Sequence, residues 1–246
     1  DERHDEPDGF GNTATHFALH GAHRLLRVRM QARLEVLERE RPAADPMPWE
    51  AVRAAVRQGG QGGPGEEALL AAQMCEPTRL VPLSEAVLAY AERCFTPGRP
   101  WLEALDALTA RIHADFVFDA DATTVATSID EVLRGRRGVC QDFAHLMLGA
   151  LRALGLPARY VSGYLLTDPP PGEPRLLGVD ASHAWVATWS PAFGWVEFDP
   201  TNNQRADARY ITLAWGGDFA DVAPLAGVII GGGTQAMDVE VTVVPQ

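Results

Sequence analysis

The sequence predicts an α+β fold in which a cysteine-bearing helix packs on an antiparallel sheet. Three observations support this prediction: apolar residues recur at helical spacing between residues 49 and 113, another amphipathic helix begins near residue 140, and short β-type runs follow between residues 158 and 198. The chain has 246 residues, of which 46% are hydrophobic and 22% are charged, and this is enough for one large domain or two small ones.

Residues 1–41 are predicted to be the end of a β-rich region. Apolar and polar residues alternate strictly over 26–36, which is the period of a half-buried antiparallel strand. Residues 13–20 are its expected hairpin partner, with the turn at 21–22, while residues 1–8 are expected to be a solvated acidic tail. Two strands alone make a marginal sheet, so we expect further N-terminal strands, either missing from this sequence or supplied elsewhere in the chain.

Residues 42–246 are predicted to form the larger region, in which helices come first. Ser84 is suited to cap one helix, and Pro100 suits the first turn of the next. The glycine-rich segment 58–65 lacks the Lys-Ser/Thr ending of a phosphate-binding loop, so we interpret it as a mobile surface loop. The helical patterns lie at 49–57, 66–75, 84–95, 100–113 and 128–133, and a short strand is expected at 116–118.

Cys140 is predicted to lie in the first turn of a helix that ends at Gly155. Unpaired N–H groups and the helix dipole favour negative charge there by ~0.3–1 kcal/mol, and thus favour the nucleophilic thiolate. The alternative is an inert core cysteine, which is common. Asp142 is interpreted as a first-turn residue that complements the dipole, and His145 as structural. The apolar stripe of this helix is Ala144, Met147, Leu148, Leu151 and Leu154.

Two later strands are predicted to place a histidine beside an aspartate. His183 opens the run 183–189 and Asp199 closes the run 195–198, and in an antiparallel hairpin these ends are neighbours. Such a pair suits a general base and the carboxylate that orients it. A lone histidine is usually structural, and Asp199 before a proline could merely cap a turn. The pair gains weight because Cys140 is available as a nucleophile.

Other segments frame these two strands. Residues 158–166 follow the cysteine-bearing helix as a strand, and residues 237–244 are predicted to be the last strand of the chain. The long proline- and glycine-rich loop at 167–177 is expected to border a substrate cleft. The glycines at 231–233 are interpreted as a turn before the last strand.

Charge and cysteine content exclude several classes of function. The formal net charge is −12 and there is no Lys/Arg cluster, which argues against a nucleic-acid partner. The sequence has no apolar run near 18 residues, so no membrane-spanning helix is expected. Cys75, Cys94 and Cys140 lack metal-ligand spacing, and Asp180 with His183 lacks a third ligand, so neither a metal nor a cofactor is expected. An odd number of cysteines suits a reducing, cytoplasmic setting.

The chain resembles the transglutaminase-like superfamily, and specifically its bacterial branch of transglutaminase-like proteins and cysteine proteases. The resemblance rests on GVCQDFAHL around Cys140, ARYVSGYL after it, DASHAW around His183 and GWVEFDPTN around Asp199. It runs from Asp8 to near the C-terminus. It implies a papain-like core in which a helix bearing the cysteine packs on an antiparallel sheet bearing the histidine and the aspartate.

The resemblance implies a Cys140, His183 and Asp199 triad. Cys140 would attack an amide or ester carbonyl of a protein or peptide substrate, with His183 moving the proton and Asp199 fixing the imidazole. The thioester would then pass to water or to an amine. The rival hypotheses are a catalytically silent protein-interaction module on the same fold, and a hydrolase that needs a partner to supply missing strands.

Further residues are candidates for supporting roles. The Cys140 backbone N–H is one expected oxyanion donor, and Gln141, Tyr160 and Tyr164 are candidates for the second. Trp185 and Trp195 are candidates for lining the substrate cleft and excluding water, although filling the core of a sheet is the commoner role of such residues.

Overall fold

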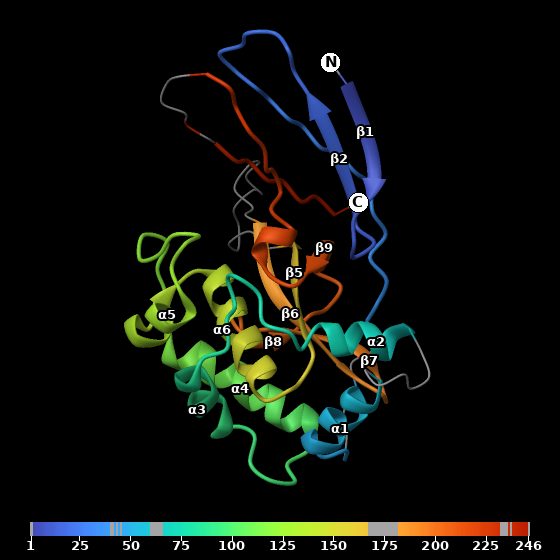
Figure 1. The fold of residues 1–246 in the computed structure, drawn as a ribbon, viewed down its shortest axis with the longest axis vertical. Coiled ribbons are helices and arrows are strands. Elements are labelled where there is room, and N and C mark those ends of the chain that lie inside the picture. The colour runs from blue at the N-terminus through green and yellow to red at the C-terminus, as the bar shows by residue number, and fades with distance from the viewer. Residues whose placement is uncertain are drawn as a thin grey trace.

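The structure is a computed structural model that describes residues 2–39, 42, 44, 46–59, 66–166, 182–231, 236 and 238–245. Helices pack around an antiparallel sheet (Figure 1), so the predicted α+β class is confirmed. The glycine-rich residues 60–65 and the predicted cleft loop 167–177 lie outside the described residues.

The helices begin where the sequence supplies caps. Ser84 is the N-cap of its helix, as predicted, and its hydroxyl accepts a hydrogen bond from the Val87 N–H. Ser128 and Glu131 form a complete capping box at the start of another helix. The α-helices are α1 (Trp49–Gly59), α2 (Glu66–Gln73), α3 (Glu85–Glu92), α4 (Trp101–Asp115), α5 (Ile129–Gly135) and α6 (Cys140–Ala153), and a short 3-10 helix follows at Phe219–Asp221.

The central sheet has five strands in the order β8-β7-β6-β5-β9, and all its pairings are antiparallel. The chain adds β6 and β7 beside β5 as successive hairpin neighbours, and then returns to place β9 on the far side of β5. The strands are β5 (Ala158–Leu165), β6 (Ser182–Ser190), β7 (Gly194–Asp199), β8 (Gln204–Arg205) and β9 (Tyr210–Gly216).

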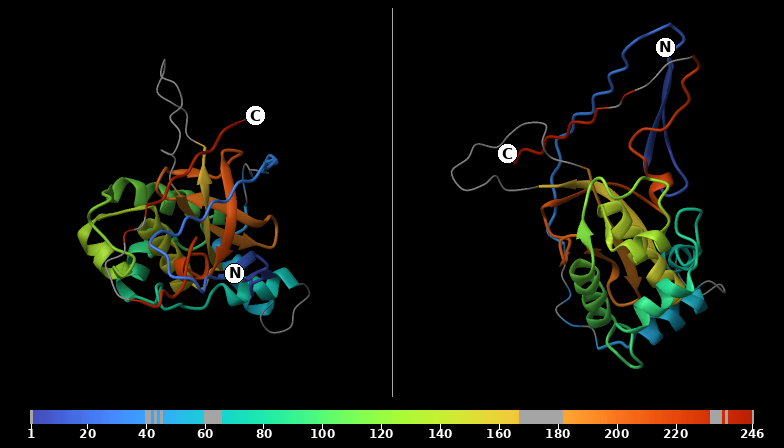
Figure 2. Two further views of the ribbon diagram at one scale, coloured as in Figure 1. Left: turned by 90° about the horizontal axis from the view of Figure 1, so that it is seen from above. Right: turned by 90° about the vertical axis from the view of Figure 1, so that its left-hand side faces the viewer.

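Helix α6 is the centre of the core. Its residues from position 142 to position 152 are all buried, between the sheet and the helices α3, α4 and α5 (Figures 1 and 2). At its C-terminal end the buried Arg152 donates hydrogen bonds to the carbonyl oxygens of Met74, Ala158 and Gly217. Gly155 follows with a φ of +74°, which is the left-handed stop that the sequence predicted.

The N-terminus of α6 is fixed by a buried carboxylate. Asp142 accepts hydrogen bonds from the Val139 N–H at 2.8 Å and from the Thr123 hydroxyl at 2.6 Å. Gly138 allows this approach, because a Cβ at that position would lie 2.6 Å from the Asp142 carboxylate. The segment before it pairs with Val117–Phe118 (β3) as the short parallel strand Arg137–Gly138 (β4). These contacts set the direction in which the first turn of α6 begins.

Both faces of the sheet are buried. One face packs on α6 through alternate residues that include Tyr160, Val186 and Phe198. The other face carries a smaller apolar cluster around Val161, Trp185 and Tyr210. The side chains that the sequence predicted as the catalytic base and its carboxylate share the register of this second face.

The N-terminal prediction is wrong in its pairing. Residues 24–39 form no strand, and the predicted acidic tail is instead the strand β1 (Glu2–Pro7), paired with β2 (Thr13–Ala18). The Asp8 carboxylate closes the turn between them by accepting from the N–H groups of Phe10 and Asn12. The alternating apolar residues after β2 find no such partner: Leu26, Val28, Met30 and Leu34 are 39–59% exposed. Residues 2–39 form an N-terminal arm, most of which extends away from the core (Figure 2).

The C-terminal prediction also needs correction. Residues 238–245 form no strand, and Met237 lies outside the described residues.

One N-terminal contact with the sheet is well defined, since the Asn12 side chain donates to the Trp215 carbonyl and accepts from the Trp215 N–H, as a neighbouring strand would. Within the described part of the chain, no helix has the length and apolarity needed to span a bilayer.

Gly163 is predicted to be intolerant of a side chain. It lies at a bulge in the β5–β9 pairing, where a Cβ would overlap the Ile211 carbonyl oxygen. We expect Gly163→Ala to lower the free energy of unfolding by about 3 kcal/mol, the upper end of what overpacking usually costs. Urea unfolding of this variant measures the loss. Gly135→Ala, at a position with open space around it, is the matched control, and an equal effect of both changes would contradict the prediction.

Candidate active site

Cys140 is the first residue of α6, as predicted. Val139 is the N-cap, with an extended backbone, and the first helical hydrogen bond runs from the Phe143 N–H to the Val139 carbonyl. The amides of the first turn therefore have no partner within the helix, and they point out of its N-terminus beside the cysteine. Cys140 is partly exposed, whereas the helix behind it is buried. The thiol is thus placed where a reagent or substrate can reach it.

His183 and Asp199 are hydrogen-bonded to each other. Phe198 pairs with Val186 across the β6–β7 hairpin, so the start of β6 and the end of β7 are close neighbours. The His183 Nε2 atom lies 2.7 Å from Asp199 Oδ2. The strand-end argument from the sequence therefore placed these two residues correctly.

Asp199 is a fully buried carboxylate with an unusually complete set of donors. Besides His183, its oxygens accept from the Tyr210 hydroxyl at 2.6 Å, the Asn202 side-chain amide at 2.7 Å, and the backbone N–H groups of Thr201 and Asn202. Burial raises the pKa of Asp199, but the hydrogen bond and charge of His183, together with Tyr210 and Asn202, hold it below the ordinary value. Asp199 is therefore ionised at neutral pH.

His183 is poised as an imidazolium. Burial lowers its pKa, but the hydrogen bonds and charges of Asp199 and Cys140 outweigh this and raise it to about 9. Nε2 bonds to Asp199, and the His183 side chain also hydrogen-bonds with the Cys140 thiol. The three residues thus form a chain of hydrogen-bonding groups: thiol, imidazole and carboxylate.

Two residues of this site carried little signal in the sequence. Asn202 lies within the GWVEFDPTN segment but was assigned no role. Tyr210 is an aromatic residue in a different strand, and only the return of β9 to the far side of β5 brings its hydroxyl to Asp199. Gln204 donates in turn to the Tyr210 hydroxyl at 2.5 Å. A sequence pattern that predicts β9 does not predict this contact, because it depends on strand order.

The three oxyanion candidates lie on two elements, α6 and β5, and differ in their surroundings. Gln141 follows Cys140 in the first turn of α6. Tyr160 is almost fully buried on β5, on the face that packs on α6, and its pKa is raised far above its usual value by burial and, less strongly, by the charges of Cys140, Asp142 and Asp218. Tyr164 is further along β5, where burial raises its pKa. Tyr160 is therefore the tyrosine with an electrostatic link to the cysteine.

The two tryptophans do not line a cleft at Cys140. Trp185 is fully buried beneath His183, which agrees with the alternative of core filling. Trp195 is partly buried and its ring lies 4.3 Å from the Arg159 guanidinium. It borders a hollow of about 450 Å³ that includes neither Cys140 nor His183; the other lining residues are Arg39, Pro42, Phe193, Val196, Glu197, Arg205 and Ala206.

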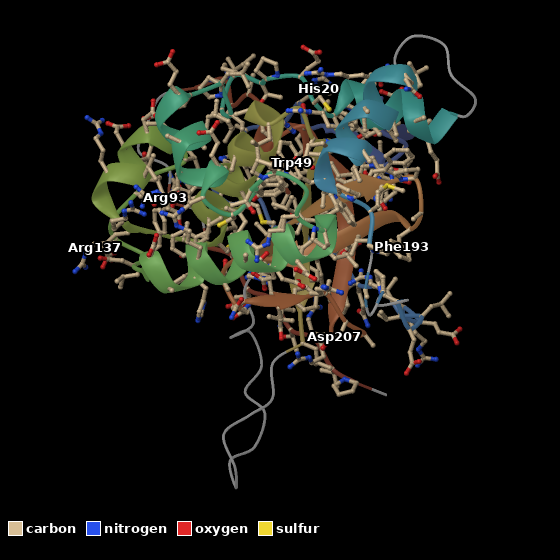
Figure 3. All side chains as sticks on the ribbon, turned by 90° about the horizontal axis from the view of Figure 1, so that it is seen from below. His20, Trp49, Arg93, Arg137, Phe193 and Asp207 are labelled. Carbon is tan, nitrogen blue, oxygen red and sulfur yellow. The ribbon has the colours of Figure 1, made fainter. Side chains whose placement is uncertain are left out.

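The rim of this hollow at Phe193 lies away from the start of α6. Phe193, on its rim, lies across the molecule from Arg137, which precedes Cys140 by three positions (Figure 3). The chemistry of the site is therefore expected at the thiol and not in the hollow.

The remaining titratable groups on α6 and the other cysteines have structural surroundings. His145 accepts a hydrogen bond from the Phe219 N–H, and burial lowers its pKa to about 4, so it is neutral at physiological pH. Burial raises the pKa of the Cys75 thiol to about 11. Within the described residues no three His, Cys, Asp or Glu side chains are arranged to hold a metal ion, and Asp180 lies outside those residues.

Comparison with protein families gives one match in this region. The sequence model described as "Transglutaminase-like superfamily" matches residues 88–200. That span begins in α3 and contains α6, β5, β6 and β7, and hence Cys140, His183 and Asp199.

Relatives extend this match to nearly the whole chain. An uncharacterized protein of Mycobacterium tuberculosis (strain H37Rv) is 42% identical over 255 residues, which cover 99% of this chain and 78% of that protein. A protein-glutamine gamma-glutamyltransferase of Pseudomonas aeruginosa is 41% identical over 80 residues, which cover 32% of this chain and 12% of that protein.

A solved structure has a similar fold. It is described as a "Putative Cysteine Protease from Cytophaga hutchinsonii", with 27% sequence identity and a TM-score of 0.51. The alignment covers 62% of this chain and 49% of the other, so this chain matches about half the length of that protein.

The raised pKa of His183 is expected to make stability depend on pH. Its unperturbed pKa is 6.5 and its pKa in the folded state is about 9, so folding is favoured while the imidazole stays protonated. This stabilisation is complete below pH 6.5 and is lost as the pH rises toward 9. We expect the unfolding free energy to fall over this window by about 3 kcal/mol.

Urea unfolding at pH 6.5 and 9 measures the effect, with His183→Gln as the comparison. The variant is expected to lose most of the pH dependence in this window. His145 does not interfere, because its lowered pKa acts below pH 6.5. The same loss of stability in the variant and the wild-type protein would contradict the assignment.

Proposed function

The chain belongs to the transglutaminase-like superfamily, and from this premise we propose that it is a cysteine-dependent enzyme acting on amide bonds of protein or peptide substrates. The relatives named above include a protein-glutamine gamma-glutamyltransferase and the structure described as a "Putative Cysteine Protease". The acyl group would accordingly pass either to an amine or to water.

One observation supports this proposal most strongly: a single imidazole lies between a buried carboxylate and a thiol at a helix N-terminus. His183 bonds Asp199 through Nε2 and interacts with Cys140. A thiol needs an adjacent base to act as a nucleophile, and that base needs a third group to fix its tautomer. These are the roles we propose for Cys140, His183 and Asp199.

The proposed reaction has two halves. The Cys140 sulfur, having given its proton to His183, attacks the carbonyl carbon and forms a tetrahedral adduct. When the adduct collapses, the C–N bond breaks, His183 gives its proton to the departing amine, and a thioester remains on Cys140. Water or a second amine then attacks the thioester, His183 takes a proton from this attacker, and the thiol is regenerated with that proton.

The oxyanion of the adduct needs donors that are already in place. The Cys140 N–H, at the open end of α6, is the first donor we propose. Tyr160 is the preferred second donor, because it belongs to the same side-chain cluster as Cys140, between the sheet and α6. Gln141 and Tyr164 are the alternatives. Replacing each tyrosine in turn by Phe shows which tyrosine hydroxyl the reaction needs.

Substitution of the triad tests the proposal directly. We expect Cys140→Ala to abolish release of amine from a peptide library, and Asp199→Asn to lower the rate by about 10²–10⁴-fold, because the imidazole loses its fixed tautomer. Cys75→Ala, which removes a thiol with a raised pKa, is the control and should keep the wild-type rate. Retention of activity in Cys140→Ala would overturn the proposal.

Alkylation separates an enzyme from a catalytically silent interaction module. Iodoacetamide should modify Cys140 faster than a free model thiol near neutral pH, and His183→Ala should remove that advantage. A Cys140 that reacts no faster than the model thiol would favour the silent module. With an active protein, assays with and without an added primary amine distinguish acyl transfer from hydrolysis through the mass of the product.

A further inference from the structure

We propose that Glu197 is a positioning residue for His183, acting through the ring of Trp185. The proposal rests on the function proposed above, in which His183 is the base. Glu197 touches neither the thiol nor the imidazole; it holds the surface on which the imidazole lies.

Trp185 forms that surface. Its ring lies nearly parallel to the His183 ring, at a centroid distance of 6.0 Å and an angle of 28°. The ring of Tyr210 packs edge-on against the same indole at 5.2 Å, and the Tyr210 hydroxyl bonds to Asp199. The single indole therefore supports both the base and a donor to its carboxylate. A tilt of this ring would disturb both partners together.

Glu197 fixes the indole in its plane. The Trp185 Nε1–H donates to Glu197 Oε2 at 2.6 Å, and an ionised acceptor makes such a bond shorter and stronger than a neutral one. Trp185 is fully buried, so water does not compete for its indole N–H, whereas Glu197 is 15% exposed and also borders the hollow described above. Glu197 is also two positions before Asp199 on β7, so one strand holds both the carboxylate that orients His183 and the one that orients its support.

Two neighbours limit the freedom of this pair. A Cβ at Gly163 would lie 2.6 Å from the Trp185 Cη2 atom, so the far edge of the indole already meets the backbone of β5. Arg39 Nη1 lies 3.4 Å from Glu197 Oε2 and offsets the charge of the carboxylate. Arg39 is itself held by the Asp207 carbonyl and the Thr212 hydroxyl. The N-terminal arm thus contributes a residue to the support of the site.

Among the described residues, the other indole with a recorded acceptor is that of Trp49, and its Nε1–H donates to a neutral backbone carbonyl, that of Thr96. The Nε1 atoms of Trp101, Trp189 and Trp215 have no hydrogen-bond partner among the described residues. Trp189 lies on the same strand and face as Trp185, four positions further on. The indole beneath His183 therefore has a carboxylate acceptor, which the buried indole of Trp189 on the same strand does not have. Packing of the core alone does not explain this difference.

Loss of this acceptor should displace the imidazole. A misplacement of about 1 Å at a reacting group is enough to lower a rate by about 100-fold. We expect Glu197→Ala to slow iodoacetamide alkylation of Cys140 by about 10-fold or more on the same grounds. Glu197→Gln should restore most of the rate, because its amide oxygen can still accept the indole N–H. Asp106→Ala, which breaks a carboxylate–arginine pair with Arg205 on the surface, is the matched control and should react as the wild type does.

The NMR chemical shifts of the His183 ring report the position of the imidazole and do not depend on catalytic activity. In the full-length protein, labelled with ¹⁵N and ¹³C, the ring signals of His183 should carry the shift that the Trp185 ring current imposes. Glu197→Ala and Trp185→Phe should both alter these signals, whereas Glu197→Gln and Asp106→Ala should leave them in place. Trp185→Phe keeps a ring under His183 but has no N–H, so it tests the bond if Glu197→Ala fails to fold.

A double-mutant cycle identifies the route of the effect. If Glu197 acts through the indole N–H, Glu197→Ala should have little further effect in the Trp185→Phe background. Full additivity of the two changes would overturn the proposal, as would unaltered His183 signals in both single variants.

The proposed function and the positioning role of Glu197 can fail separately. If wild-type Cys140 reacts no faster than a model thiol while the His183 signals respond to Glu197→Ala, the proposed function fails and the positioning role stands. If Cys140 is activated but neither its rate nor the His183 signals respond, the positioning role is wrong and the proposed function stands.

Discussion

The buried charge of Asp199 is the constraint on which the site depends. A carboxylate without contact with water costs several kcal/mol unless paired and hydrogen-bonded. Here the donors come from three places in the chain: His183 on β6, the backbone and Asn202 side chain just after β7, and Tyr210 on β9. The carboxylate is satisfied only when these strands are assembled in their native order. The strand order that satisfies Asp199 is therefore the same one that orients the His183 imidazole.

The nucleophile reaches this arrangement from a separate element. Helix α6 is buried along its length, with Asp142 fixing its first turn and Arg152 binding three carbonyl oxygens near its last. A helix held at both ends cannot slide along its axis, so the position of Cys140 relative to the sheet is set by the core. The site forms where a rigid helix end meets a rigid strand pair, and such placement on regular elements is more accurate than placement on loops.

The sequence predicted the parts of the site that depend on local order. Cys140 at a helix start, and His183 and Asp199 at adjacent strand ends, follow from spacing and hairpin geometry. Tyr210 and the Glu197–Trp185 bond were missed, because they depend on which strands are neighbours and on which face a side chain lies. The strand predicted over 26–36 failed for the converse reason: its alternation is local, but a strand needs a partner, and β2 pairs with β1. The domain boundary at residue 41 stays a prediction.

In the proposed reaction Cys140 forms a covalent acyl intermediate with the help of His183 and Asp199. Intact-protein mass spectrometry after brief exposure to a peptide p-nitrophenyl ester detects such an intermediate. We expect a single added acyl group, located on Cys140 by peptide mapping and released by hydroxylamine as a thioester is. We also expect no adduct in Cys140→Ala. An adduct that persists in Cys140→Ala, or a wild-type protein that never acquires one while the ester is consumed, would contradict the proposed reaction.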